Sequence, residues 1–350
     1  MYESFYGFKE RPFNTLPDPD FLYMSPKHEM ALTYLEYGLS SQAGFTVLTG
    51  EIGSGKTTLI NYLLGRLDNG TTNVALIFNT NISPLDFLET LLKEWAVSCT
   101  RMEKAGLYDS LNDFLLNAYK KKTRVVLIVD EAQNLPFETL EELRMISNLN
   151  DEKVPLLHII LAGQPNLIHR LNNPKLEQLR QRVVVHYHLE PLSEQETFVY
   201  IEHRLKKAQA KDFNIFSSDA VGSIYTHSQG IPRIINLICD LALVYGYAEQ
   251  IKPINKNTVN MVVEDRRKMG LGLAGKSRAS NAMEEDLYAS NAEKTVLLSR
   301  KHKELSDNVY ELALIVKKMI CIKQHVARHD QEIKHLYKKI KGLEEKYSVV

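Results

Sequence analysis

The chain has 350 residues, of which 43 are basic, 43 are acidic and 44% are hydrophobic. This length and composition predict a globular chain with two domains and an extension, and the balanced charge excludes a protein whose whole surface binds nucleic acid. Three widely spaced cysteines match neither a zinc site nor a disulfide framework, which favours a reducing, cytoplasmic location, and no apolar run reaches the roughly 20 residues that cross a membrane.

The first 43 residues are expected to form an arm and a helix ahead of the core. Prolines lie among aromatic residues up to Tyr23, and an apolar period suited to a helix runs over Met30–Leu39. Short β-rich runs then alternate with helical ones, which predicts a parallel sheet in an α/β domain over residues 44–190. The five expected strands are Phe45–Thr49, Val74–Asn79, Val125–Val129, Leu157–Ala162 and Val183–His188.

Capping signals place two helices between these strands. One is expected over Leu85–Trp95, after a serine and a proline, and the other over Leu111–Tyr119, after a capping box formed by Ser110 and Asp113. After the fifth strand the pattern is purely helical, which predicts a small all-helical lid domain over residues 191–268.

The C-terminal part of the sequence has a different character. Glycines and other small residues over residues 269–281 predict a flexible linker. In residues 282–350, apolar side chains recur every seven residues from Leu298 to Tyr347, with a second seam between them, which predicts a coiled coil. The pattern favours self-association, with a long amphipathic helix packed on its own domain as the alternative.

A phosphate-binding loop is indicated directly after the first expected strand. Residues 50–57 match the P-loop pattern, and a helical run begins at Thr58. The glycines let backbone N–H groups face phosphate oxygens, Lys56 is expected to hold the β- and γ-phosphates, and Thr57 is expected to hold Mg²⁺. The flanking strand and helix disfavour the alternative, a chance glycine-rich turn. The residues expected to contact ATP here are Gly50, Glu51, Ile52, Gly53, Ser54, Gly55, Lys56, Thr57 and Thr58.

The third expected strand ends in two acids, Asp130 and Glu131. A buried parallel strand tolerates acids at its carboxyl edge, where the P-loop also lies. Asp130 is expected to orient Mg²⁺ together with Thr57, and Glu131 to act as the base that polarises the water attacking the γ-phosphate. Capping of the following helix by the acid pair is the weaker alternative.

Three further candidates follow the later strands. Gln164 is a candidate sensor of the γ-phosphate beside Glu131, with a turn residue before proline as an equal alternative. Arg182 is a candidate arginine finger for the ATP of a neighbouring subunit, with Arg180 in reserve and a surface salt bridge as the alternative for both. In the helical lid, Arg233 begins a helix and is expected to report the γ-phosphate to the lid.

Together these motifs resemble the AAA+ ATPases of the general secretion pathway protein A family over roughly residues 1–265. The resemblance implies a P-loop NTPase core with sheet order 5-1-4-3-2, nucleotide between the α/β domain and the lid, Arg233 as a second sensor, and a ring or helical homo-oligomer. It rests on Tyr6-Gly7-Phe8 with Pro12-Phe13, Pro17-Asp18-Pro19 with Phe21-Leu22-Tyr23, the P-loop, Asp130-Glu131-Ala132-Gln133, Leu161-Ala162-Gly163-Gln164-Pro165 and Gly230-Ile231-Pro232-Arg233-Ile234-Ile235-Asn236.

The resemblance favours an ATPase that uses ATP and Mg²⁺ to drive oligomeric assembly or remodelling in a bacterial secretion or envelope-associated system. The predicted coiled coil departs from family members that carry a membrane helix and a wall-binding domain, which leaves a role in secretin assembly open. One alternative is an ATP-dependent regulator of transposition on duplex DNA, with basic runs at residues 120–124, 204–211 and 266–268 as candidate contacts, although solvated charges explain them equally. The other is a nucleotide-gated scaffold that acts through the coiled coil, against which Glu131 and Arg182 count.

Overall fold

The structure is a computed structural model that describes residues 1–41, 44–67, 70–78, 80–99, 103–151, 154–270 and 272. The chain divides into two units, Met1–Gly275 and Lys276–Val350, and the described residues belong to the first. Three predicted features lie outside the described residues: the coiled coil, most of the linker, and Asn79 at the end of the second expected strand.

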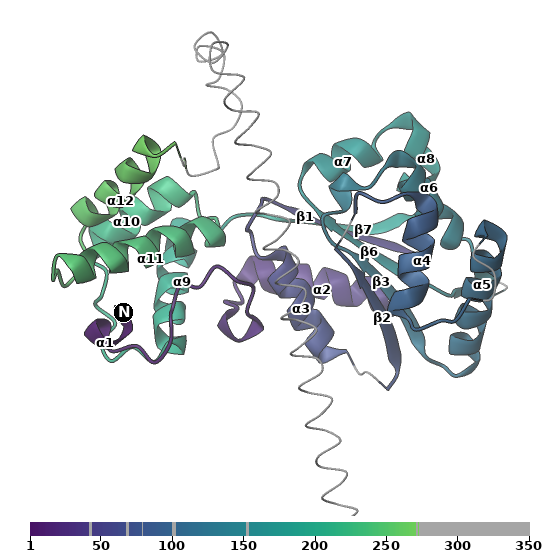
Figure 1. The fold of residues 1–350 in the computed structure, drawn as a ribbon, viewed down its shortest axis with the longest axis horizontal. Coiled ribbons are helices and arrows are strands. Elements are labelled where there is room, and N and C mark those ends of the chain that lie inside the picture. The colour runs from purple at the N-terminus through teal and green to yellow at the C-terminus, as the bar shows by residue number, and fades with distance from the viewer. Residues whose placement is uncertain are drawn as a thin grey trace, which may run out of the picture. The chain divides into compact units, whose positions relative to one another are not determined.

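Helices separate β1, β2 and β3 and lie between β6 and β7, and among the described residues the elements after β7 are helices (Figure 1). The strands are β1 (Phe45–Gly50), β2 (Thr72–Ile77), β3 (Arg124–Val129), β4 (Asn150–Asp151), β5 (Val154–Pro155), β6 (His158–Gly163) and β7 (Val183–Leu189). The helices are α1 (Glu3–Tyr6), α2 (Pro26–Ser40), α3 (Lys56–Arg66), α4 (Pro84–Glu94), α5 (Lys104–Lys120), α6 (Phe137–Ile146), α7 (Asn166–Leu171), α8 (Glu177–Arg180), α9 (Glu194–Lys207), α10 (Ser218–Ser228), α11 (Pro232–Ala248) and α12 (Lys256–Lys268).

The five long strands form one parallel sheet in the order β2-β3-β6-β1-β7. Counted as five core strands and read from the β7 edge, this is the order 5-1-4-3-2, so the predicted α/β core is confirmed. Because the strands are parallel, the carboxyl ends of β1, β3 and β6 meet at one edge of the sheet. The segments that follow these strands therefore lie close together.

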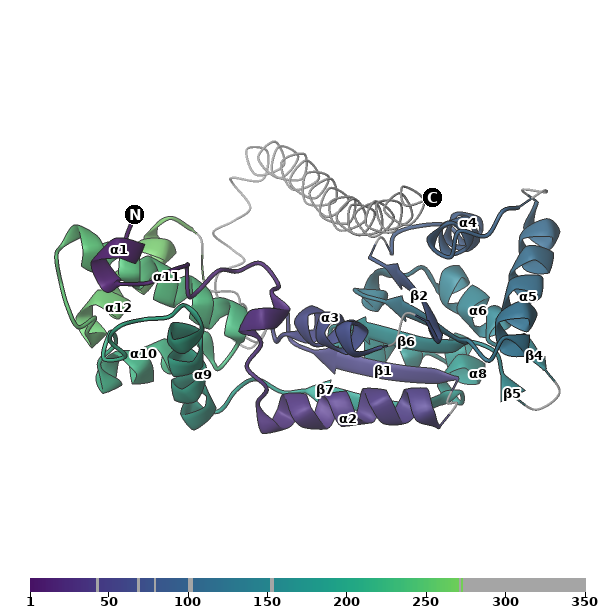
Figure 2. The same ribbon diagram turned by 90° about the horizontal axis from the view of Figure 1, so that it is seen from below.

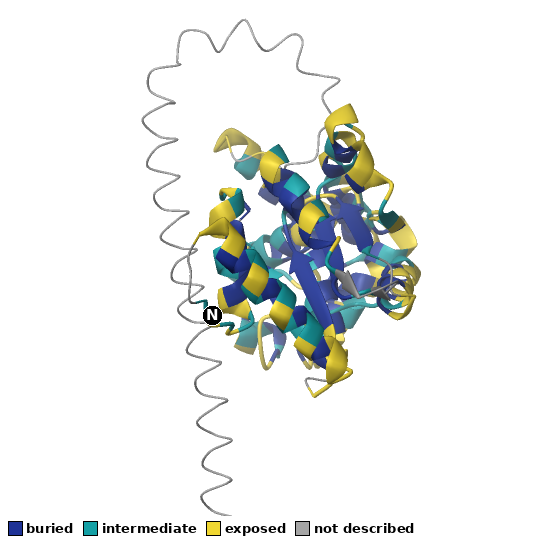
Figure 3. Ribbon diagram, turned by 90° about the vertical axis from the view of Figure 1, so that its right-hand side faces the viewer, coloured by how far each residue is buried: buried dark blue, intermediate teal, exposed yellow. Residues whose placement is uncertain are grey.

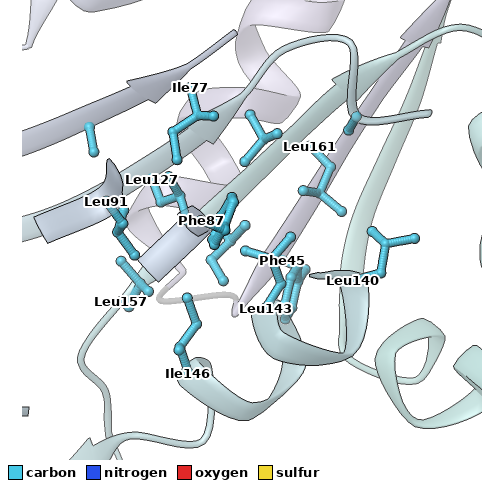
Figure 4. Packing of buried hydrophobic residues seen from close by; sticks show 14 of the residues in the cluster. Phe45, Ile77, Phe87, Leu91, Leu127, Leu140, Leu143, Ile146, Leu157 and Leu161 are labelled. Atoms are coloured by element: carbon cyan, nitrogen blue, oxygen red, sulfur yellow. The ribbon is translucent and has the colours of Figure 1, made fainter. Parts of the chain in front are cut away.

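Helices cover both faces of this sheet. On β3, Val125, Leu127 and Val129 point into a hydrophobic cluster with α4, α5 and α6, whereas Val126 and Ile128 point into a second cluster with α2 and α3. Figure 4 shows the first cluster, with side chains of the strands and helices packed against one another. Figure 3 shows strands buried between helices whose outer sides are exposed. The sheet therefore forms a fixed base for the loops at its carboxyl edge.

A separate hydrophobic core lies among α9, α10, α11 and α12, and the N-terminal arm belongs to it. In Figures 1 and 2, α1 lies beside α11. The division into an α/β domain and a lid at residues 190 and 191 stays a prediction, since residues 1–275 form one compact unit. The arm side chains in this core are Tyr2, Tyr6, Phe8, Phe13 and Phe21.

Arg204 of α9 fastens the arm to this helical core. Its buried guanidinium donates hydrogen bonds to the backbone carbonyl oxygens of Pro12 (2.6 Å), Asn14 (3.0 Å) and Phe21 (3.5 Å). It also lies over the Phe21 ring, 4.6 Å from the ring centre. Arg204 therefore binds the protein backbone. It belongs to a basic run considered above as a DNA contact, but its buried side chain is not exposed to DNA phosphates.

Among the predicted helices, α5 differs most from its expected start. α5 begins at Lys104 and not after Ser110, whose hydroxyl donates to the Gly106 carbonyl oxygen one turn earlier (2.9 Å). The reason is packing, because Leu107 and Leu111 are fully buried one helical turn apart and extend the apolar face upstream of Ser110. The capping-box pattern of Ser110 is therefore coincidental.

Other local signals agree with the structure. Ser83 caps α4 by accepting a hydrogen bond from the backbone N–H of Asp86, and Ser193 with Glu196 forms a capping box at α9. The short antiparallel pair β4–β5 was not expected, because strands of two residues show no periodic pattern. Among the described residues, no helix is long and apolar enough to cross a membrane, and no three His, Cys, Asp or Glu side chains are grouped to hold a metal ion.

Candidate functional site

The P-loop, residues 50–57, connects β1 to α3 at the carboxyl edge of the sheet. Gly55 has a left-handed φ of 103°, a conformation that glycine adopts without a steric cost. The amine of the buried Lys56 donates to the backbone carbonyl oxygens of Gly50 (2.8 Å) and Glu51 (2.9 Å). Burial lowers the pKa of Lys56, while nearby carboxylates oppose the shift. The P-loop backbone therefore surrounds the ammonium group of Lys56, whose positive charge favours binding of a phosphate group.

Thr57 and Asp130 bring two oxygen ligands together beside the P-loop. The Thr57 hydroxyl donates to Oδ2 of Asp130 (2.6 Å), and Oδ1 of Asp130 accepts from the backbone N–H of Glu131 (2.9 Å). Asp130 is only 3% exposed, and burial raises its pKa, although both hydrogen bonds oppose the rise. A hydroxyl and a carboxylate are hard oxygen ligands, so their chemistry fits Mg²⁺.

The carboxylate of Glu131 is held by two amide side chains. Oε2 of Glu131 accepts from Nε2 of Gln133 (2.6 Å) and from Nε2 of Gln164 (3.3 Å). Oε1 of Gln133 also accepts from the backbone N–H of Gln164 (3.0 Å). The structure brings Gln164 to Glu131, and its role as a sensor stays a prediction. Sequence reasoning assigned no role to Gln133, although it closes the Asp-Glu-Ala-Gln motif.

The first turn of α11 lies directly on the P-loop. The backbone N–H of Arg233 donates to the carbonyl oxygen of Gly53 (3.2 Å), and a Cβ atom at Gly53 would lie 2.4 Å from Cβ of Arg233. Only glycine allows this approach. The carbonyl oxygen of Gly230 accepts from the backbone N–H of Leu192 (2.9 Å), so the start of α11 is also tied to the connection after β7. The side-chain role predicted for Arg233 remains a prediction.

The two candidate finger arginines are bound within their own chain. Nη1 of Arg182 donates to the carbonyl oxygen (3.3 Å) and the hydroxyl (3.1 Å) of Ser147, at the end of α6. Arg180 forms an exposed ion pair with Glu177 (2.8 Å), which agrees with the surface salt bridge considered for it. A role for Arg182 toward a second copy of the chain stays a prediction.

His28 of α2 also reaches the P-loop, and sequence reasoning did not select it. Its ring is buried, with Nε2 3.3 Å from the Ser54 carbonyl oxygen and Nδ1 2.8 Å from Oγ of Ser25. A single histidine in an apolar-periodic helix carries no sequence signal for such a contact, because the contact depends on how α2 packs on β1 and β7.

Comparison with known proteins relates this site to a family. A family model described as an AAA domain matches residues 39–171. General secretion pathway protein A of Aeromonas hydrophila is 41% identical over 251 residues, which are 71% of this chain and 45% of that protein. The chain therefore spans less than half the length of this relative.

Solved structures share the fold. The ORC2 protein of Aeropyrum pernix, solved as ADPNP–ADP complexes, has a TM-score of 0.56 and 18% identity over 74% of this chain and 72% of that chain. CDC6P of Pyrobaculum aerophilum has a TM-score of 0.57 and 16% identity over 78% of this chain and 74% of that chain. At these identities the likeness supports the fold alone.

Proposed function

We propose that this chain, which belongs to the AAA+ proteins and is a relative of general secretion pathway protein A, is an ATPase that binds ATP at the P-loop and hydrolyses it with Glu131. The observation that carries the proposal is a single cluster at the carboxyl edge of the sheet. In it, Lys56 lies inside the loop, the Thr57 hydroxyl contacts Asp130, and the Glu131 carboxylate lies one residue further on.

Each group has a chemical task in this proposal. Lys56 and the inward-facing N–H groups of the P-loop bind the β- and γ-phosphates. Thr57 and Asp130 would hold Mg²⁺, which offsets the negative charge of the phosphates when it is bound. Glu131 accepts a proton from the attacking water, with its carboxylate oriented by the amides of Gln133 and Gln164.

Two variants test the chemistry. Glu131→Gln is expected to bind ATP while turnover falls about a hundredfold or more, because the proton acceptor is lost. Lys56→Ala is expected to lose ATP binding. Binding of a fluorescent ATP analogue and phosphate release measure the two steps separately, and equal urea midpoints show that the variants are folded. Undiminished turnover in Glu131→Gln would overturn the assignment.

We further propose that hydrolysis drives assembly or remodelling of a ring or helical homo-oligomer in a secretion or envelope-associated system. The relation to general secretion pathway protein A supports this use. If Arg182 acts on the ATP of a neighbour, mixing Arg182→Ala with Lys56→Ala subunits restores part of the turnover, since one mixed interface keeps both groups. No restoration would count against a finger between subunits, and assembly that requires duplex DNA and declines with salt would favour the DNA-targeting alternative.

A further inference from the structure

Two consecutive carbonyl groups of the P-loop are bound by segments far away in the sequence. The Gly53 carbonyl oxygen accepts from the backbone N–H of Arg233, and the Ser54 carbonyl oxygen lies 3.3 Å from Nε2 of His28. In a trans peptide, the carbonyl of one residue and the N–H of the next point in opposite directions. A Ser54 carbonyl held by His28 therefore turns the N–H of Gly55 away from α2, toward the side where the loop binds phosphate.

The protonation of His28 is determined by its partners. A carbonyl oxygen only accepts, so Nε2 must carry the proton, and Nδ1 of the neutral ring then accepts from the Ser25 hydroxyl (2.8 Å). Burial lowers the pKa of His28, so the neutral ring is the stable form at neutral pH. Ser25 is itself completely buried and caps α2, which fixes the position of the ring.

The turn formed by residues 25–28 is held against the connection between β7 and α9. The amine of Lys27 donates to the carbonyl oxygen of Pro191 (2.6 Å) and lies 3.6 Å from carboxylate oxygens of Glu190 and Glu196. Glu196 in turn belongs to the capping box that starts α9. The turn at residues 25–28 therefore has a fixed position from which His28 reaches the P-loop.

We propose that His28 is a positioning residue for phosphate binding, which orients the N–H of Gly55 through its hydrogen bond to the Ser54 carbonyl oxygen. This inference rests on the proposed ATPase function. Loss of this single buried hydrogen bond is expected to weaken ADP binding and to raise KM for ATP about tenfold. Because the bond touches neither Glu131 nor Asp130, kcat is expected to change less than about twofold.

Two amide substitutions separate the contact from the general effect of losing a histidine. The amide nitrogen of His28→Gln reaches about as far as Nε2 of the ring and keeps the donor to Ser54, whereas the shorter amide of His28→Asn reaches only Ser25. His158 is a second buried histidine, located at the opposite end of the sheet beside Thr46, and His158→Asn is the matched control. The full chain is titrated with fluorescent ADP in Mg²⁺, and KM and kcat are measured for ATP.

The expected result is a tenfold loss of ADP affinity in His28→Asn, near-native affinity in His28→Gln and in His158→Asn, and an unchanged kcat. Wild-type protein that binds no ADP would overturn the proposed function itself. Wild-type protein that binds ADP while the two His28 variants bind it equally would overturn the role of His28 alone. If His28→Asn does not fold, His28→Met, which keeps the volume and lacks the donor, takes its place with the same criteria.

Discussion

Arg204 offers a direct test of how the N-terminal arm is held. Replacing it with methionine keeps most of the buried volume and removes the donors to the carbonyl oxygens of Pro12 and Asn14, which lie at 2.6 and 3.0 Å. Hydrogen bonds from a charged donor contribute about 1.5–3 kcal/mol each to stability. The lower value for these two bonds predicts that the free energy of unfolding falls by about 3 kcal/mol. The loss is limited by the free energy of opening the arm, because the carbonyl groups regain water once the arm has left the helical core.

Two measurements follow this effect. Urea unfolding reports the stability of the helical core, and limited chymotrypsin digestion reports opening of the arm, since the arm is rich in aromatic residues that become accessible. Lys206→Met is the matched control, because Lys206 lies on the same helix in an exposed pair with Glu202 (2.7 Å), and it is expected to change little. If Arg204→Met left both the urea midpoint and the digestion rate at wild-type values, the assignment of Arg204 to the arm would be wrong.

Two shorter predictions concern the acids. Gln133→Leu removes a donor to Glu131 and the acceptor for the N–H of Gln164. We expect kcat to fall about tenfold while ADP affinity, measured by titration, stays constant. An unchanged kcat would show that Gln133 does not contribute to turnover. Burial raises the pKa of Asp130, so the folded state binds its proton more tightly than the unfolded state. Stability is therefore lost as the pH rises from the pKa of the unfolded state, about 4, toward the raised pKa of the folded state. Asp130→Asn is therefore expected to raise Tm at pH 7 and not below about pH 4, as thermal unfolding across this range shows; equal Tm at pH 7 would contradict it.

The parallel sheet was predictable because each core strand is a short run rich in β-forming residues, followed by turn or loop residues, and strand–helix alternation permits few arrangements. The family resemblance supplied the strand order. The start of α5 was not predictable from capping residues alone, because Ser110 resembles a cap while Leu107, which extends the helix, gains its importance only from burial in the core. Tertiary packing decides the boundary there.

The candidate site also combines residues that the sequence indicates with one that it does not. Lys56, Thr57, Asp130 and Glu131 lie in contiguous motifs at strand ends, so the sequence indicates both their identity and their common edge. His28 contacts a P-loop residue 26 positions away. Tertiary packing brings His28 to the P-loop, and no sequence motif surrounds this residue. The sequence alone therefore gives no reason to select it.

The arm links the helical core to the P-loop by a route separate from α11. Tyr23 packs edge-on against Tyr200 and at a tilt against His203 of α9, with ring centres 6.1 and 5.6 Å apart. Arg204 holds the arm residues Pro12 and Asn14 on the same helical core. α2 instead packs on β1 and β7. Leu22 and Met24, on either side of Tyr23, pack instead against the cluster of α2 and α3. A rotation of α9–α12 against the sheet therefore pulls on the arm between these contacts, directly before the turn from which His28 binds the P-loop. A rotation that moves Arg233 away from Gly53 consequently also strains the contact between His28 and the next carbonyl group of the loop.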